Sequence, residues 1–341
     1  MENKKYSFKN DYSELAHERV LNALLAKGTK QFEGYGFDEC SLRASELIKT
    51  LIKRSDADVH FISGGTQANL TVLSSILRPF EAVIAAESAH IAIHEAGAIE
   101  ATGHKICTVK GDNGKICADE IKGIITAHED EHMVKPRAVY ISDSTELGTI
   151  YKKNELKALS LFCRNNDLYL YLDGARIGAA LNSPSSDLSY ADVAELVDVF
   201  YIGGTKNGAL FGEAIVICNG ALKNDFRYNL KQRGAMLAKG AVIGIQFEAL
   251  FQDGLYDELA INANRSALML AEGIRKAGYS FLYPAETNMI FPVFPTETAE
   301  MLHKFYNFYD WSKNGDMVSA RMVTSWATQD GVIDEFLELL R

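Results

Sequence analysis

The stretch VDVFYIGGTKNGALFGEA, residues 197–214, runs from an apolar segment into a loop of small residues that holds one lysine. Lys206 follows the apolar segment and lies among Gly203, Gly204 and Gly208. Solvated lysines usually lie on helix surfaces, so solvation explains this lysine poorly, although a surface loop lysine remains an open interpretation. Lysine amines pushed toward neutrality form Schiff bases with carbonyl compounds. The stretch therefore predicts a strand that ends at a reactive loop.

Six other short runs share the apolar, β-rich character of this strand. The seven runs are 59–63, 82–86, 105–109, 138–142, 168–172, 197–203 and 213–218. Most are apolar almost throughout, which is typical of parallel strands covered by helices on both faces. Residues 155–166 have helical spacing behind Asn154, a residue type that caps helix starts well. We therefore predict an α/β fold with a mainly parallel seven-stranded sheet between helices.

The sequence changes character near residue 245. We predict a large domain over 1–245, with an N-terminal arm, and a small α+β domain over 246–341. Within the small domain, helices are expected over 258–278, 296–311 and 332–340. No Gly/Ser-rich or Pro-rich linker separates the two domains, so we expect a tight interface between them.

Composition excludes several classes of protein. The 341 residues are 47% hydrophobic and 23% charged, which excludes a disordered chain, a coiled coil and a collagen-like fibre. The formal charge of -10 makes nucleic acid an unexpected partner. Five scattered cysteines without a Cys-x-x-Cys pair favour a reducing cytoplasm. No signal peptide or run of about 20 apolar residues is evident, so we expect a cytoplasmic protein with no membrane partner.

The residues that follow the strands carry the chemistry, because ligands of open α/β sheets bind at the carboxyl ends of strands. FISGGTQANL, residues 61–70, leads from a strand into a helix through two glycines, and such a helix start binds phosphate. It matches neither a Walker loop nor a dinucleotide motif, and a purely structural turn is an equally good interpretation.

Two further junctions add a carboxylate and a ring. LYLYLDGARIGAA, residues 168–180, ends its apolar strand on Asp173, which either serves a bound cation or donor, caps the next helix, or pairs with Arg176. His90 and His94 have i, i+4 spacing, but no third ligand is evident and we expect no metal. A histidine in this place more plausibly stacks on, or hydrogen-bonds to, a bound ligand.

Together these features match the needs of pyridoxal phosphate. The lysine holds the aldehyde, the carboxylate keeps the pyridine nitrogen protonated, the glycine loop holds the phosphate, and a ring covers one face. The joint pattern is far more specific than any single part.

At these residues the chain resembles the threonine aldolase and β-eliminating lyase family of fold-type I pyridoxal-phosphate enzymes, closest to its low-specificity threonine aldolase and phenylserine aldolase branch. The resemblance runs over nearly the whole length, through YGFDE, SGGTQANL, SAHIAIHEAGA, DGARIG, GTKNGALFGEA and ARMVTSWAT. It implies that Lys206 is the Schiff-base lysine, Asp173 the partner of the pyridine nitrogen, and His90 the stacked ring.

The resemblance also implies the remaining roles. Gly65, Thr66 and Thr205 would hold the phosphate. Arg176 and Arg321 match the family's two arginines near the substrate carboxylate, a task that suits planar donor forks.

Several positions depart from the family's pattern. Lys9, Asn10 and Asp11 stand where the family often has Arg-Ser-Asp, and Asn10 is the expected hydrogen-bond donor to the substrate. Glu146 in DSTELGT replaces the histidine that contacts the substrate hydroxyl. For the phosphate-binding cation of the region 233–240, the candidates are Arg233 and Lys239, with Lys239 favoured.

The expected activity is retro-aldol cleavage of a β-hydroxy-α-amino acid, such as threonine, allo-threonine or phenylserine, to glycine and an aldehyde. His90 and Glu146 are the candidate bases. The alternatives are β-elimination from an aromatic or sulfur amino acid, and a non-catalytic protein that binds pyridoxal phosphate. Tyr12, Tyr35 and Phe37 would either shape the substrate pocket or belong to the core. The resemblance implies a homodimer or homotetramer with the active site at the subunit interface.

Overall fold

The central sheet holds seven strands in the order β2-β8-β7-β6-β5-β3-β4 in a computed structural model that describes residues 5–341. The strands are β2 (Asp58–Ile62), β3 (Glu81–Ala86), β4 (Ile106–Val109), β5 (Lys135–Ser142), β6 (Tyr169–Asp173), β7 (Val199–Gly203) and β8 (Glu213–Ile217). Strand β8 is antiparallel to both neighbours, whereas the other neighbouring pairs are parallel. This arrangement confirms the predicted mainly parallel seven-stranded sheet.

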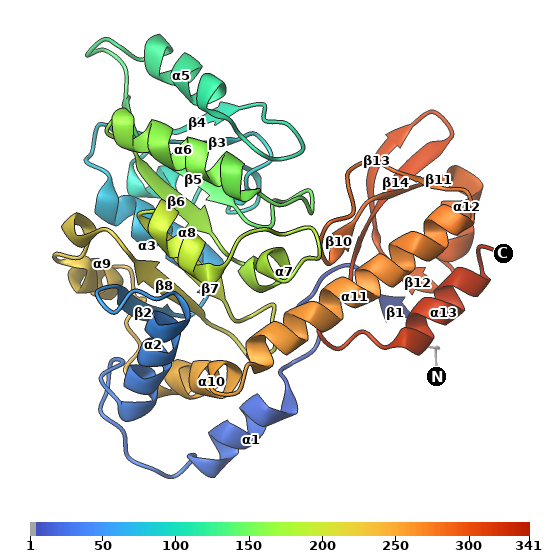
Figure 1. The fold of residues 1–341 in the computed structure, drawn as a ribbon, viewed down its shortest axis with the longest axis horizontal. Coiled ribbons are helices and arrows are strands. Elements are labelled where there is room, and N and C mark those ends of the chain that lie inside the picture. Colours follow the sequence, from blue (N-terminus) through green and yellow to red (C-terminus); the bar gives the residue numbers. More distant parts are fainter. Residues whose placement is uncertain (1–4) are drawn as a thin grey trace.

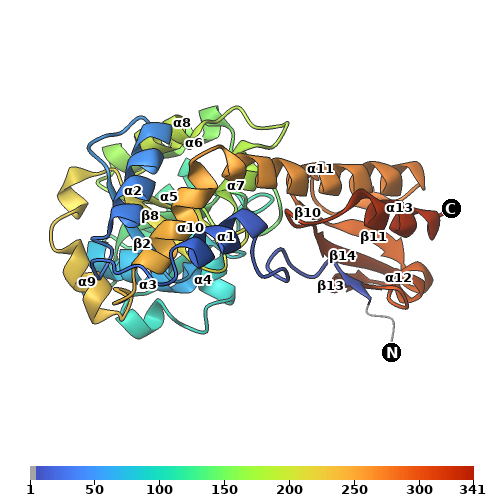
Figure 2. The same cartoon turned by 90° about the horizontal axis from the view of Figure 1, so that it is seen from below.

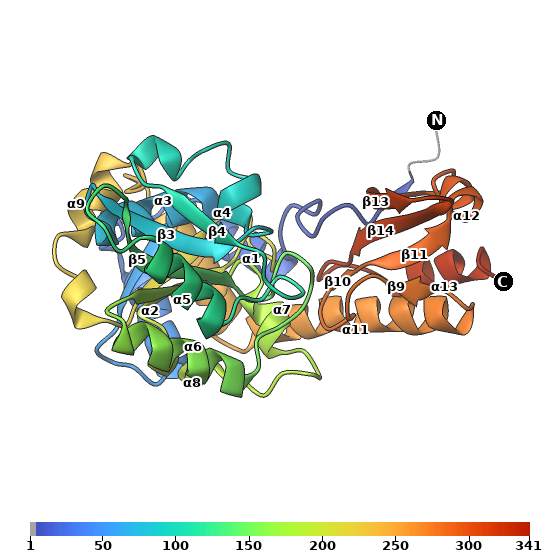
Figure 3. The same cartoon turned by 90° about the horizontal axis from the view of Figure 1, so that it is seen from above.

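Helices cover both faces of this sheet, which explains why most of its strands are largely apolar. Every residue of β3, β7 and β8 is buried. Helix α3 lies on one face and α6 and α8 lie on the other (Figure 3). The helices before residue 252 are α1 (Glu18–Ala26), α2 (Glu39–Leu51), α3 (Gly65–Ile76), α4 (His90–Ile93), α5 (Ala118–Ala127), α6 (Lys153–Asn165), α7 (Ile177–Leu181), α8 (Tyr190–Leu196), α9 (Phe226–Gln232) and α10 (Ala241–Phe251).

A second, smaller body follows at the other end of the long helix α11 (Leu255–Lys276), as Figures 1 and 2 show. Its sheet has the order β10-β14-β11-β9, with β13 on β14. The elements are β9 (Ser280–Phe281), β10 (Met289–Ile290), β11 (Pro292–Pro295), α12 (Thr296–Leu302), β12 (Tyr306–Asn307), β13 (Tyr309–Asn314), β14 (Met317–Val323) and α13 (Asp330–Glu338). The short strand β1 (Tyr6–Ser7) pairs with β12, so the N-terminal arm reaches the small body.

Helix α11 belongs to both hydrophobic cores. Its first turns place Leu255 and Leu259 in the core of the large body, and its later turns place Leu270 and Ile274 in the core of the small one. The predicted division at 245/246 lies within α10 and stays a prediction. We propose that α11 is the connection, because one helix without a break between the two cores holds them together.

Two local predictions were wrong. Helix α6 begins at Lys153 with Lys152 as its N-cap, because the carboxylate of Glu155 accepts the backbone N–H of Lys152 at 2.7 Å. Asn154 therefore lies inside the helix. The helix expected over 296–311 ends at Leu302, and the aromatic residues after it form β12 and β13, as suits β-rich FYNFYDW.

The other predicted segments of the small body have the expected structure. Helix α11 covers most of 258–278, and α13 covers most of 332–340. Among residues 5–341, no helix has both the length and the apolar character needed to span a membrane.

Candidate active site

Strand register brings the chemically loaded loops to one edge of the sheet. Ile62 and Gly203 both pair with Glu213, and Ser142 pairs with Asp173. The loops that leave these strands enclose a cavity of about 340 Å³, within the roughly 300–1,000 Å³ of small-molecule sites. Its lining residues are Tyr12, Ser63, Gly64, Gly65, Thr66, His90, Ser142, Ser144, Glu146, Asp173, Ala175, Arg176, Tyr201, Thr205, Lys206, Phe211 and Glu213.

Asp173 is buried at the end of β6 and is held by four donors. Tyr140 Oη donates to Oδ2 at 2.6 Å, Asn69 Nδ2 donates to the same oxygen at 3.1 Å, and the N–H of Ala175 donates to Oδ1 at 3.0 Å. Tyr201 Oη also donates to Oδ1. Burial alone would raise the pKa of Asp173, but the hydrogen bonds outweigh burial and lower it. The carboxylate therefore stays ionised inside the protein.

Lys206 lies in the loop between β7 and β8, facing the cavity. Burial, followed by the positive charge of Arg176, lowers the pKa of its amine, while the carboxylates of Asp11, Asp173 and Glu213 act in the other direction. A lowered pKa makes the neutral, nucleophilic amine more accessible at neutral pH. The predicted strand-end lysine thus lies in the same cavity as the predicted carboxylate.

His90 begins α4 and connects to Asp173 through two side chains. Its Nδ1 lies 2.8 Å from Glu95 Oε1, and the same oxygen accepts a hydrogen bond from Asn69 Nδ2 at 2.7 Å. Asn69 in turn reaches Asp173. The other oxygen of Glu95 is buried without a hydrogen-bond partner in the described chain. The side chain of His90 is 38% exposed. The hydrogen bonds through Glu95 and Asn69 therefore orient the ring while leaving it open to the cavity.

Glu146 lies in the loop that follows β5, beside His90. Its Oε1 accepts hydrogen bonds from the N–H of His90 at 2.9 Å and from Ser142 Oγ at 2.7 Å. Burial raises the pKa of Glu146, and the nearby Asp173 adds to the increase. A carboxyl group with a raised pKa can hold or accept a proton at neutral pH.

The glycine-rich start of α3 opens onto the cavity. Gly65 and Thr66 are the first residues of this helix, whose N-terminal N–H groups have no partner inside the helix and suit an anion. Thr205 lies on the other side of β8, and its hydroxyl donates to Glu213 Oε1 at 2.8 Å. These three predicted phosphate-binding residues line one cavity.

The two predicted arginines differ in their surroundings. Arg176 makes a two-pronged ion pair with Asp11, from Nε at 2.6 Å and from Nη2 at 3.0 Å. Arg321 donates to the carbonyl of Lys9 at 3.1 Å and lies 3.2 Å from the sulfur of Met289. Burial, followed by the charge of Arg176, lowers the pKa of Arg321 to about 10.

Arg321 and three other predicted residues do not line the cavity. Asn10 Oδ1 accepts hydrogen bonds from the N–H of Tyr12 and from Ser13 Oγ, both at 3.0 Å, so the side chain caps its own turn. Lys239 lies just before α10. Arg233 touches the neighbourhood of α3 through its carbonyl, which accepts a hydrogen bond from Gln67.

Of the three aromatic residues singled out in the sequence, only Tyr12 lines the cavity. Tyr35 and Phe37 are exposed and lie under the cations of Lys231 and Arg227. None of the three belongs to the core.

Sequence reasoning missed several residues of the site: Asp11, Asn69, Glu95, Tyr140, Tyr201 and Glu213. Most lie within helices or strands, where a single polar residue in the sequence gives no indication of a functional role. Glu213 had a visible signal, because a carboxylate opens an otherwise apolar strand seven residues after Lys206. Asp11 was named only as part of a departure from the family's pattern.

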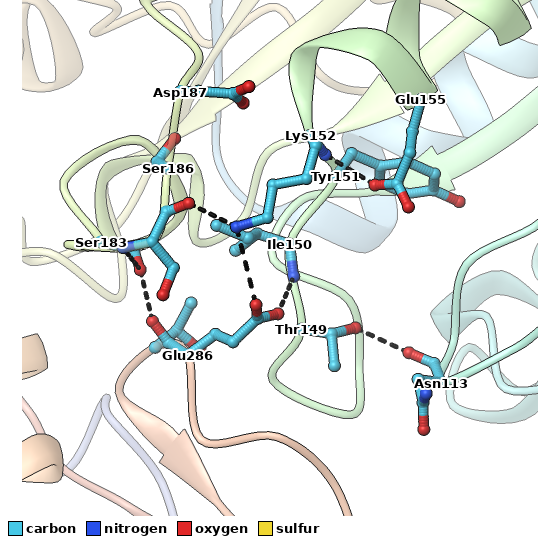
Figure 4. A network of polar contacts seen from close by, with 12 residues as sticks. Asn113, Thr149, Ile150, Tyr151, Lys152, Glu155, Ser183, Ser186, Asp187 and Glu286 are labelled. Carbon is cyan, nitrogen blue, oxygen red and sulfur yellow. Dashed lines mark hydrogen bonds and ion pairs between the residues drawn. The ribbon is translucent and has the colours of Figure 1, made fainter.

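The loop that carries Glu146 is fastened to the small body (Figure 4). Glu286 Oε2 accepts the N–H of Ile150 at 3.0 Å, its Oε1 lies 3.7 Å from Lys152 Nζ, and its carbonyl accepts Ser183 Oγ at 2.6 Å. Gly148 packs against the small body so closely that a Cβ there would lie 2.5 Å from the carbonyl of Met289. The two bodies therefore set the position of Glu146 together.

Within residues 5–341, no group of three or more His, Cys, Asp and Glu side chains is arranged to hold a metal ion.

Comparisons with known proteins agree with this geometry. The family model described as β-eliminating lyase matches residues 19–296. A low-specificity L-threonine aldolase of Pseudomonas aeruginosa is 34% identical over 327 residues, which cover 94% of this chain and 92% of that protein. A solved threonine aldolase structure from Leishmania major superposes with a TM-score of 0.97 at 45% identity and covers 98% of both chains. Aspartate aminotransferase from Thermus thermophilus, at 16% identity and a TM-score of 0.72, shares the fold, with 98% of this chain and 90% of that chain covered.

Proposed function

The chain belongs to the β-eliminating lyase family, and from this premise we propose that it cleaves β-hydroxy-α-amino acids of the threonine type to glycine and an aldehyde. It is a lyase of a family whose members depend on pyridoxal 5'-phosphate. The observation that carries the proposal is the meeting of Lys206, the ionised Asp173 and the start of α3 in one cavity.

The residues of this cavity fit pyridoxal phosphate. When bound, the cofactor supplies an aldehyde that captures amines and a cationic ring that withdraws electrons from the amino acid's Cα. Lys206 is the amine that would hold it through a Schiff base. The ionised Asp173 would suit a protonated ring nitrogen, and the ring of His90, which lines the cavity, would cover one face of the cofactor. Gly65 and Thr66 offer N–H donors to the phosphate, and Thr205, whose hydroxyl donates to Glu213, would approach it from across β8.

Substrate binding falls mainly to the arginines. Arg321 has no carboxylate partner among the described residues, so a substrate carboxylate would neutralise its buried charge. Asp11 fixes the plane of the Arg176 guanidinium, which lies in the cavity wall. Together the two cations orient the amino acid, and that orientation selects which bond to Cα breaks.

Glu146 and His90 remove the proton from the substrate hydroxyl. Glu146, with its raised pKa, accepts this proton as the Cα–Cβ bond breaks, and His90 acts beside it directly or through water. The bond from the N–H of His90 to Glu146 Oε1 holds the two groups next to each other. The aldehyde leaves after the proton has moved.

The assembly completes the site. Tyr12 lines the cavity yet is 56% exposed, and Tyr35 and Phe37 are exposed as well, which favours a homodimer or homotetramer that covers them. In such an assembly, Asn10 would approach the substrate and Lys239 would reach the phosphate of the neighbouring copy. The free thiols of Cys40, Cys107, Cys163 and Cys218 are buried, which accords with a proposed cytoplasmic location.

The test is a retro-aldol assay of the purified protein supplied with pyridoxal phosphate, on L-threonine, L-allo-threonine and the phenylserine isomers. We expect glycine and an aldehyde in equal amounts. Release of ammonia and a 2-oxo acid would replace the proposal with β-elimination. A protein that turns yellow with cofactor but releases none of these products would be a non-catalytic binder.

A further inference from the structure

Glu213 has no part in the proposed function, although it lies inside the cavity. It is the first residue of β8 and its side chain is buried. Oε1 accepts the hydroxyl of Thr205 at 2.8 Å, and Oε2 accepts the N–H of Gly204 at 2.9 Å. The N–H of Gly212 donates to Thr205 Oγ1 at 3.0 Å. Glu213 thus holds the two residues that precede Lys206.

Sheet register places Glu213 between the two halves of the proposed phosphate site. Ile62 at the end of β2 and Gly203 at the end of β7 both pair with Glu213, from opposite sides. The loop into α3 leaves after Ile62, and the loop with Thr205 leaves after Gly203. A phosphate group held by both loops would therefore lie near this carboxyl group.

The hydroxyl of Thr205 has a single proton, and Glu213 decides where it points. When Glu213 is ionised, it accepts the hydrogen bond from the Thr205 hydroxyl, and Thr205 then presents only lone pairs to an anion. When Glu213 carries a proton, it can donate to Thr205 Oγ1 instead, which frees the hydroxyl proton for the phosphate. Protonation also removes a negative charge beside a dianion.

Resting on the function proposed above, we propose that Glu213 takes up a proton from solvent when the phosphate group of the cofactor binds, and so turns Thr205 into a phosphate donor. Glu213 is then a positioning residue that acts through Thr205. It makes the phosphate-dependent part of cofactor affinity sensitive to pH.

The surroundings of Glu213 allow its carboxyl group to be protonated near neutral pH. Burial raises the pKa of Glu213 to about 7, and the positive charge of Lys206 acts against the increase. Asp173 on β6 faces it with a like charge. Three phenols, those of Tyr171, Tyr201 and Tyr256, also lie near Glu213, and they stay neutral because burial raises their pKa values well above 10.

The test compares how tightly the apoprotein binds pyridoxal phosphate and pyridoxal at increasing pH. Reaction with Lys206 is common to both ligands, so the ratio of their Kd values isolates the phosphate group. Above pH 7 that group is a dianion throughout, since its second pKa is about 6. We expect the wild-type preference for pyridoxal phosphate to weaken above pH 7 by up to about tenfold per pH unit.

Two variants separate this role from a structural one. Glu213→Gln is permanently neutral and can donate from its amide, so its preference should be independent of pH over the same range. Asp143→Asn removes another buried carboxyl group outside the cavity lining and should keep the wild-type pH dependence. A Glu213→Gln protein with the wild-type pH dependence would overturn the proposal.

A measurement on the wild-type protein avoids any failure of the variant to fold. Calorimetry in buffers of different ionisation enthalpy counts the protons taken up on binding. At a pH above 7, pyridoxal phosphate should bind with a greater proton uptake than pyridoxal, and equal uptake would contradict the proposal. Absence of aldol cleavage in the substrate assay would instead count against the proposed function, because these binding measurements need no turnover.

Discussion

Arg176 and Arg321 are both proposed to bind the substrate's carboxylate, yet among the described residues only Arg176 has a carboxylate partner of its own. The bidentate pair with Asp11 neutralises Arg176. Arg321 has a carbonyl and a sulfur atom as its nearest partners, and burial lowers its pKa to about 10. A desolvated cation gains most from a carboxylate, so we propose that Arg321 is the main receptor for the substrate's carboxylate and that Arg176 assists it.

Replacing Arg321 by Gln should therefore weaken substrate binding. Hydrogen bonds to charged groups contribute about 1.5–3 kcal/mol, which corresponds to a KM for L-threonine raised by roughly 10- to 150-fold. Steady-state kinetics would measure it. Arg265→Gln is the control, since Arg265 makes an exposed ion pair with Asp330. An unchanged KM in Arg321→Gln would remove this arginine from the site.

Lys206→Ala should lose the covalent link to the cofactor. The methyl group has no amine to condense with the aldehyde, so borohydride treatment should leave no cofactor attached to the denatured chain, whereas the wild-type protein should keep it. Mass spectrometry of the reduced proteins is the measurement. If the variant retained a reducible link, another lysine would hold the cofactor.

At the residue scale, the sequence predicts those site residues that lie at or just after the end of an apolar strand. Asp173 ends β6 and Lys206 lies in the loop that follows β7, and the ends of parallel strands meet at one edge of the sheet. The partners that set their protonation were not predictable, because Tyr140, Tyr201 and Asn69 come from other elements and meet Asp173 only after folding. The Asp11–Arg176 pair spans 165 residues for the same reason.

At the element scale, the loop between β5 and α6 depends on the small body for its position. Glu286 accepts the N–H of Ile150, and Thr287 Oγ1 donates to the carbonyl of Gly148 at 2.9 Å. Glu146 lies on this loop, so movement of the loop moves the candidate base. Sequence periodicity reports strands and helices but contains no information about which distant residue holds a loop.

Glu286→Ala should loosen this loop. Leaving the N–H of Ile150 without its acceptor costs about 1–3 kcal/mol of the free energy of unfolding, and kcat should fall while cofactor content stays normal. Denaturant unfolding and single-turnover rates would measure both effects. Glu272→Ala removes only an exposed i, i+4 partner of Lys276 and should change neither. A Glu286→Ala protein with wild-type kcat would show that Glu146 needs no support from the small body.

The run 296–311 shows where local sequence patterns fail to predict secondary structure. The run 296–311 has helical spacing at its start, but its aromatic residues have high β-propensity and pair with β14 and β1 in the small body. Long-range pairing overrides the local pattern there. Most of the central strands were predictable because burial on both faces gives them a nearly continuous apolar run.

At the scale of the whole molecule, buried carboxyl groups set the pH dependence of stability. Burial raises the pKa of Asp143 from 3.8 to about 8. Between these values the unfolded chain loses the proton and the folded chain keeps it, so this group's contribution falls as pH rises and is fully lost above about pH 8. The slope for one such group is up to about 1.4 kcal/mol per pH unit.

Asp143→Asn should remove that slope. We expect a higher free energy of unfolding than that of the wild type at pH 7, with the difference growing from about pH 4 to about pH 8 and constant beyond. Denaturant titrations across this range would measure it. A difference that does not change with pH would mean that Asp143 titrates normally in the folded protein.

Assembly is the step that a single chain leaves open, and a mixing experiment addresses it. Neither Lys239 nor Arg233 lines the cavity of its own chain, so a phosphate-binding cation from this region would have to come from a neighbouring copy.

Lys206→Ala and Lys239→Ala are each expected to be impaired, because one loses the covalent link and the other loses a phosphate contact. In a mixed dimer, one site combines an intact Lys206 from one copy with an intact Lys239 from the other. Activity should therefore reappear when the two variants are unfolded together and refolded as a mixture. If the mixture remained as impaired as its components, Lys239 would serve its own chain or none, and the cation at the phosphate would have to be sought elsewhere.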